Sequence, residues 1–220
     1  MKRIVSIGML ALMTSPAIAQ KYKFIMKTEA GTIEGILYDK TPLHSKNFVK
    51  LSKSGFYNGL LFHRVIPNFM IQGGDPNSRN AKPDIMLGDG DTGKKIPAEF
   101  KYEYFHKRGA LAAARDNNPE KASSGCQFYI VEGKKYTEAE LTGMEKAREM
   151  KIPDTHKKVY ESVGGTPFLD GNYTVFGEVT KGMDAVDKIV NSPRNRNDRP
   201  NKDQHIISVK IKKKFLGIYW

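Results

Sequence analysis

Cysteine is almost absent from this sequence, with Cys126 as the single example among 220 residues. One cysteine forms no disulfide within the chain and excludes zinc sites that need several thiolates. The fold must therefore be held by its core, which a chain of this length can build without covalent staples. We interpret Cys126 as a packing residue rather than a redox group.

Long apolar runs are also missing, apart from a short one at the N-terminus. Residues 4–13 are mostly apolar, follow the basic pair Lys2-Arg3, and lead to Ala17-Ile18-Ala19, the small-x-small pattern that signal peptidase cleaves. The run is too short to span a bilayer and remain there. We predict a signal peptide over 1–19, a mature chain from Gln20, and export to the periplasm in preference to full secretion. A buried N-terminal helix is the alternative.

The familiar catalytic constellations are missing as well. The sequence shows no Ser-His-Asp set in a recognisable context, no paired carboxylates at catalytic spacing and no phosphate-binding glycine loop. Of the five histidines, His63 is interpreted as structural, and the other four show no metal-ligand spacing. We expect neither a metal nor a cofactor.

Acidic residues are outnumbered: 24 Asp and Glu stand against 36 Lys and Arg, for a formal charge of +12. Such a charge is compatible with nucleic acid or an anionic surface as a partner. Lys210 and Lys212, however, alternate with Val209 and Ile211, as on a strand with one solvated face. We therefore expect no nucleic-acid partner, and keep a basic surface-binding protein as an alternative.

What the sequence does contain is a series of short strand-like runs separated by turns, with helices between some of them. Thr41 and Pro42 predict a helix with Thr41 as its N-cap and Gly55 as its stop, and a second helix is expected from about Met183 to Asn191. Many short strands favour a closed antiparallel barrel or a sandwich, and the pattern alone does not choose between them. The expected strands are 22–28, 32–38, 60–66, 69–72, 109–114, 127–131, 174–179 and 206–214.

Residues 133–165 interrupt this pattern. Thr137 and Glu140 predict a capping box that begins a helix, with Pro153 at its end, and a second short helix follows, ending at Gly164-Gly165. We predict one domain over 20–220 with a helical insertion at 133–165. The insertion is either a surface elaboration, or a flap or docking surface that selects protein substrates.

The most informative segment is 62–76, which reads FHRVIPNFMIQGGDP. It places Arg64 and Gln72 on strand-like backbone beside Phe69 and Met70, a shallow apolar patch with a fixed cation at its edge. The segment resembles the signature of the cyclophilin family almost residue for residue. The matches continue through 109–114, 124–131, 168–171 and 173–179, so that the resemblance covers the chain from about 22 to 214 apart from the insertion.

The resemblance implies a mainly β fold, a closed eight-stranded antiparallel barrel capped by two helices. It implies a peptidyl-prolyl cis/trans isomerase in which Arg64 is the catalytic arginine and Gln72 holds both Arg64 and the substrate backbone. It also implies a proline pocket, a backbone site for the preceding residue, and a specificity groove with an opposite rim. In this resemblance the proline pocket is formed by Phe69, Met70, Tyr129 and Leu169. The backbone site for the preceding residue is at Ala114 and Arg115. Gln127 lines the specificity groove, and Phe168 and Tyr173 form the opposite rim.

Isomerisation explains why these residue types are needed. Rotation about the Xaa-Pro bond crosses a barrier of about 18–20 kcal/mol because amide resonance is lost in the twisted state. No bond is broken, so a donor aimed at the prolyl nitrogen and a pocket for the ring suffice. The predicted partners are proline-containing segments of unfolded or exported proteins. The alternative is a binding module or chaperone that recognises such segments with little required turnover.

The rim departs from many eukaryotic members of the family, with Phe168 in place of Trp and Tyr173 in place of His, as in bacterial relatives. Phe168 lacks the indole N–H donor. We therefore expect weak cyclosporin binding with isomerase activity retained. We also expect a monomer.

Overall fold

The computed structural model describes residues 21–83, 85–215 and 218–219, so the predicted signal peptide over 1–19 lies outside the described residues. The described part is mainly β, as expected, and its strands pair antiparallel in one curled sheet with the order β3-β4-β6-β5-β7-β2-β1-β8-β9. The strands are β1 (Tyr22–Thr28), β2 (Gly31–Leu37), β3 (Phe62–Ile66), β4 (Met70–Gly73), β5 (Ala110–Ala113), β6 (Phe128–Val131), β7 (Val175–Lys181), β8 (Ile206–Phe215) and the two-residue β9 (Ile218–Tyr219).

The sheet forms a half-barrel rather than the fully closed barrel that the resemblance implied. In the described ranges, β3 and β8 are joined not by a ladder but by one bridge between Leu61 and His205. Backbone hydrogen bonds of 2.9 Å from Phe62 to Gln204 and 2.8 Å from Ile206 to Leu60 support that bridge. The five residues of β3 are too few to follow the ten-residue β8 along its length. The eight principal strands are nevertheless the eight that the sequence predicts.

Side chains alternate between the two faces of the half-barrel, as the period of a strand requires. The concave face buries the main core, which includes Val65, Ile71, Leu111, Phe128 and Ile130. The opposite face of the same strands carries a second cluster, built on small residues of β5 and on Met70, Tyr129 and Val131. This second face positions the site described below.

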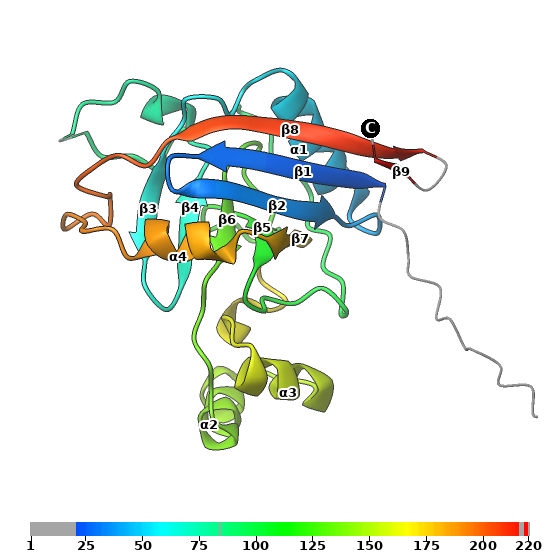
Figure 1. Cartoon of the computed structure of the whole chain (residues 1–220). Coiled ribbons are helices and arrows are strands. Elements are labelled where there is room, and N and C mark those ends of the chain that lie inside the picture. The colour runs from blue at the N-terminus through cyan, green and yellow to red at the C-terminus, as the bar shows by residue number, and fades with distance from the viewer. Residues whose placement is uncertain (1–20, 84, 216–217, 220) are drawn as a thin grey trace, which may run out of the picture.

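Two helices cover the ends of the half-barrel (Figure 1): α1 (Pro42–Lys53) packs against β8, and α4 (Met183–Val190) packs against β2, β3 and β4. Thr41 precedes α1 as predicted, but it does not cap the helix through its side chain, which bonds Tyr38 instead. The carboxylate of Glu99 accepts from the N–H groups of Leu43 at 3.1 Å and His44 at 3.0 Å. A carboxylate suits this place because helix N-termini present unpaired donors and positive potential.

The insertion projects away from the sheet as a pair of helices, α2 (Glu138–Arg148) and α3 (Asp154–Ser162) (Figure 1). The predicted capping box of Thr137 and Glu140 is confirmed. Pro153 does not end the first helix as expected: α2 ends at Arg148, because Glu149 takes a left-handed φ of 50°, and Pro153 precedes α3 instead. A small core of their own holds the helices: Tyr136, Leu141, Ile152 and Tyr160.

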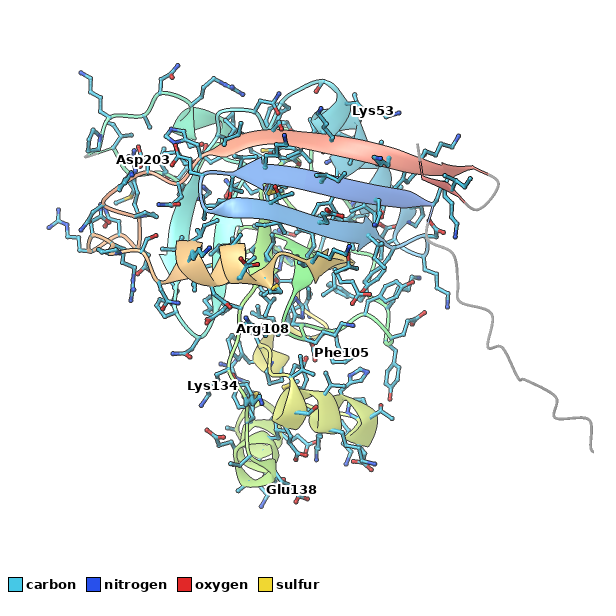
Figure 2. All side chains as sticks on the ribbon, in the orientation of Figure 1. Lys53, Phe105, Arg108, Lys134, Glu138 and Asp203 are labelled. Atoms are coloured by element: carbon cyan, nitrogen blue, oxygen red, sulfur yellow. The ribbon has the colours of Figure 1, made fainter. Side chains whose placement is uncertain are left out.

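The two ends of the insertion meet at a narrow neck, defined by the antiparallel bridge between Lys134 and Gly165. Lys134 lies at this neck and Glu138 near the far end of the projection (Figure 2). Gly133 and Gly165 both have positive φ, 65° and 154°, and a Cβ on Gly165 would overlap the carbonyl oxygen of His106. Glycine is required here because no other residue allows the backbones this close.

Candidate active site

The site begins as a row of side chains across four neighbouring strands. Strand register pairs Arg64 with Gln72, Gln72 with Tyr129, and Tyr129 with Ala112. Directly paired residues on one face of a sheet have Cβ atoms about 5 Å apart. The register therefore brings the guanidinium, an amide and a phenol ring together on the convex face.

A pocket of about 170 Å³ opens above this row. Its walls combine apolar rings and a thioether with a cation at the edge. Met70 and Tyr129 are buried, whereas Phe69, Leu169 and Tyr173 are partly exposed at the mouth. Nine of the eleven residues that the sequence nominates line it: Arg64, Phe69, Met70, Gln72, Ala114, Arg115, Tyr129, Leu169 and Tyr173.

Arg64 is held at the rim by two neighbours. Its Nη1 donates to Gln72 Oε1 at 3.4 Å, and its Nε lies 3.8 Å from a carboxylate oxygen of Asp198. The side chain is 43% exposed. Among the described residues no partner is found for Nη2, which leaves that nitrogen available to a ligand in the pocket.

Gln127 lies behind this pair rather than in the pocket. Its Oε1 accepts from Gln72 Nε2 at 2.9 Å, while its own Nε2 donates to the carbonyl oxygens of Gly88 at 2.6 Å and Gly90 at 2.7 Å. The amide of Gln127 therefore connects Arg64, through Gln72, to the loop that follows β4. Gln127 also lines the neighbouring groove with Arg115 and Asp91, where sequence reasoning expected it.

Phe168 is the second nominated residue outside the pocket. Its ring centroid lies 5.6 Å from that of Phe69, and the Arg148 guanidinium at the end of α2 lies 5.2 Å from it. Tyr173, on the same rim, meets Tyr129 edge-on at 6.0 Å and has Arg115 at 4.8 Å from its ring. Phe168 thus supports the pocket wall through Phe69 and joins that wall to the insertion.

A buried hydrogen-bond chain beneath the pocket was not found from the sequence. The hydroxyl of Tyr129 lies 2.9 Å from His106 Nε2, and His106 Nδ1 lies 2.8 Å from Asp170 Oδ1. Because a carboxylate accepts, Nδ1 carries the proton, and in the neutral ring Nε2 accepts from Tyr129. Burial raises the pKa of Tyr129 well above its ordinary value, which keeps that hydroxyl a donor.

The chain of hydrogen bonds continues into the insertion. Tyr160 of α3, fully buried, donates to Asp170 Oδ2 at 2.6 Å. Burial, followed by the nearby Asp170, raises the pKa of Tyr160. The floor of the pocket is thereby connected to a helix of the insertion through three side chains.

Among the described residues, no three His, Cys, Asp or Glu side chains are grouped as they are in a metal site. Within the same ranges, every helix is too short or too polar to cross a bilayer. Burial raises the pKa of the Cys126 thiol to about 11. A buried thiol with so high a pKa is a poor nucleophile.

Comparison with protein families decides the identity of this arrangement. Residues 23–211 match the family model described as cyclophilin type peptidyl-prolyl cis-trans isomerase/CLD. The chain belongs to the cyclophilin family. This cyclophilin is 38% identical to a peptidyl-prolyl cis-trans isomerase of Acinetobacter baylyi, over 85% of this chain and 84% of that protein. A protein of Staphylococcus saprophyticus named for the same activity is 37% identical, over 86% of this chain and 91% of the relative.

Solved structures show the same fold. A cyclophilin type peptidyl-prolyl cis-trans isomerase of Cryptosporidium parvum superposes with a TM-score of 0.66 at 24% identity, covering 88% of this chain and 99% of that one. A second structure of that protein, obtained in the presence of the dipeptide Ala-Pro, gives 0.65 at 24% identity, with 87% and 99% covered. Family and relatives together establish this cyclophilin as a peptidyl-prolyl cis-trans isomerase, as the signature in 62–76 predicts.

Proposed function

We propose that this cyclophilin isomerises Xaa-Pro bonds in exported proteins, and that Arg64 stabilises the twisted amide while the apolar pocket holds the proline ring. One observation carries the proposal: a positioned guanidinium with a free nitrogen stands at the rim of a pocket lined by Phe69, Met70 and Leu169. The Ala-Pro dipeptide present with the Cryptosporidium parvum structure supports a proline ligand.

The geometry suits the chemistry. As the amide twists, the prolyl nitrogen regains a lone pair, and a donor that meets it there binds the transition state more tightly than the ground state. Arginine stays charged and presents its donors in a rigid fork, whereas lysine is a mobile point charge. Gln72 and Gln127 fix the fork before substrate arrives, so that little reorganisation is needed as charge develops.

The test compares Arg64→Ala and Arg64→Lys with the wild type in a protease-coupled assay on a short Ala-Pro peptide. Loss of one preorganised donor should lower kcat/KM about 100-fold or more, with Lys restoring only part of it. Arg196→Ala is the matched control, since Arg196 is exposed and does not line the pocket. Equal rates for Arg64→Ala and wild type would reject the catalytic role. Aggregation suppression without turnover would favour the binding-module alternative.

Export rests on the N-terminal sequence, in which a basic pair, a short apolar run and Ala17-Ile18-Ala19 form a signal peptide. Cell fractionation and N-terminal mass spectrometry test it. A mature chain that begins at Gln20 in the exported fraction supports the proposal, and a cytoplasmic chain that retains residues 1–19 contradicts it.

Weak cyclosporin binding belongs to the same proposal. Phe168 offers no N–H donor at the rim, and its ring already packs against Phe69 and Arg148. A drug that needs that donor would leave a polar group unpaired, at a cost of about 1–3 kcal/mol. Inhibition of the isomerase at nanomolar cyclosporin would refute this.

A further inference from the structure

A second groove lies beside the proline pocket, between the half-barrel and the insertion. Its volume of about 320 Å³ exceeds the 170 Å³ of the proline pocket. Phe105, labelled in Figure 2, lies between the sheet and α3, where this groove runs. One wall comes from the segment 100–105 and the other from the start of α3 and the residues before it. Its apolar and aromatic lining residues include Tyr102, Phe105, Met150, Pro153, His156 and Tyr173.

The floor of the groove is a stack of rings that joins both walls. The rings of Phe105 and His156 are nearly parallel at 3.8 Å, and Tyr102 approaches His156 at 5.0 Å. Phe105 in turn meets Tyr160 edge-on at 5.4 Å. Tyr102 nevertheless stays 70% exposed. Exposed aromatic surface that lines a concavity is typical of a binding site.

The groove adjoins the proline pocket at Tyr173. Tyr173 lines both of them, and Asp170, which lines the groove, is hydrogen-bonded to the His106 that holds Tyr129. An extended polypeptide advances about 3.3 Å per residue. A substrate whose proline occupies the pocket can therefore cross Tyr173 and enter the groove within a few residues.

The charges around the groove are mostly positive. Lys101 and Lys151 line it and are exposed. The carboxylates near them, Glu103 and Glu145, form ion pairs with Lys40 and Lys157 instead. Asp170 is already engaged by His106 and Tyr160. Complementarity therefore favours a ligand that brings an apolar side chain and a carboxylate together.

We propose that this groove is a second substrate subsite, which holds an aromatic or large aliphatic side chain of the same polypeptide segment that places its proline beside Arg64, with an acidic residue next to it. The subsite rests on the proposed function and names its preferred substrate: unfolded segments in which an Xaa-Pro bond lies a few residues from a hydrophobic residue flanked by Asp or Glu. Without the insertion, the wall that holds Met150, Pro153 and His156 would be absent.

The test uses Ala-Pro peptides that carry either Phe-Glu or Ser-Gln at each position up to about four residues on either side of the proline, a reach of about 13 Å. The wild type should prefer the best Phe-Glu peptide over its Ser-Gln partner by about tenfold in kcat/KM, the scale of burying one aromatic side chain. Tyr102→Ser should reduce that ratio to about 2, and Lys151→Glu should reverse the contribution of the glutamate.

Ile207→Ser is the matched control, because Ile207 is 52% exposed on β8 and lies outside the groove; its ratio should equal that of the wild type. A wild type that does not discriminate, or a Tyr102→Ser variant that slows both peptides equally, overturns the subsite. Absence of turnover with every peptide contradicts the proposed function instead. In that case, fluorescence anisotropy of labelled versions of the same peptides measures their binding affinities directly. A wild type that binds the Phe-Glu and Ser-Gln peptides equally well overturns the subsite, and a preference for Phe-Glu that Tyr102→Ser reduces supports it.

Discussion

The hydrogen bond between Tyr160 and Asp170 offers the sharpest test of how the insertion is joined to the half-barrel. Tyr160→Phe removes one hydroxyl from a fully buried ring and changes no other volume. Asp170 Oδ2 then loses the donor that stands at 2.6 Å. A hydrogen bond to a charged group contributes about 1.5–3 kcal/mol, so we expect the free energy of unfolding to fall by about 2 kcal/mol. For a chain of this size the same change lowers Tm by roughly 4–8 °C.

Urea denaturation followed by far-UV circular dichroism measures the effect, with Tyr136→Phe as its matched control. Tyr136 belongs to the same small core and is 8% exposed, but no hydrogen bond of its hydroxyl is found in the described part of the chain. Tyr136→Phe should cost less than about 0.5 kcal/mol, as substitutions without a named interaction do. Equal losses for the two variants would show that the bond to Asp170 contributes nothing specific and would refute the inferred connection.

Three further perturbations probe the site, the core and the neck. Gln127→Leu removes the amide that anchors Gln72, and should lower kcat/KM on an Ala-Pro peptide by about tenfold through a loosened Arg64; an unchanged rate contradicts that anchoring. Burial lowers the pKa of His63 to about 4. Because the unfolded chain takes up a proton on His63 near pH 6.5 and the folded chain does so only near pH 4, the free energy of unfolding has its full value above pH 6.5 and falls as the pH drops towards 4. Between pH 7 and pH 4.5, urea titrations should show the wild type losing about 2 kcal/mol more of that free energy than His63→Leu. Equal pH slopes would count against this. Gly165→Ala should destabilise the fold by about 3 kcal/mol or more, because its Cβ would strike neighbouring backbone; a normal Tm would show that the neck can relax.

The part of the site nearest Arg64 was predictable because it is local in the chain. Arg64 and Gln72 lie eight residues apart on a hairpin, and strand alternation alone puts both on one face with Met70. Tyr129 comes from a strand far along the sequence, and only the family resemblance placed it there. Closure of the barrel was overestimated, since the ends of β3 and β8 depend on strand lengths that the pattern does not determine to within one or two residues.

The chain of hydrogen bonds beneath the pocket escaped sequence analysis for a different reason. His106 and Asp170 are 64 residues apart, and no periodicity connects them. Their positions on either side of the insertion were the only available signal. The same holds for Glu99, whose carboxylate accepts from the N-terminal N–H groups of α1 in place of the predicted cap, Thr41. Glu99 and its partner Leu43 are 56 residues apart. Long-range polar pairs of this kind follow from the packed fold and not from local propensity.

The narrow neck between Lys134 and Gly165 has a consequence for how this molecule can change over time. Both ends of the insertion leave the half-barrel at one bridge, between Lys134 and Gly165. For the strands on either side, the residues between Lys134 and Gly165 therefore amount to a closed loop. The entropic cost of such a loop grows slowly, by about 0.6 kcal/mol for each doubling of its length. Segments of quite different length and sequence can therefore be exchanged there without shifting the register of β6 or β7. The neck is a natural grafting point, at which client preference can diversify while the isomerase beneath it is inherited unchanged.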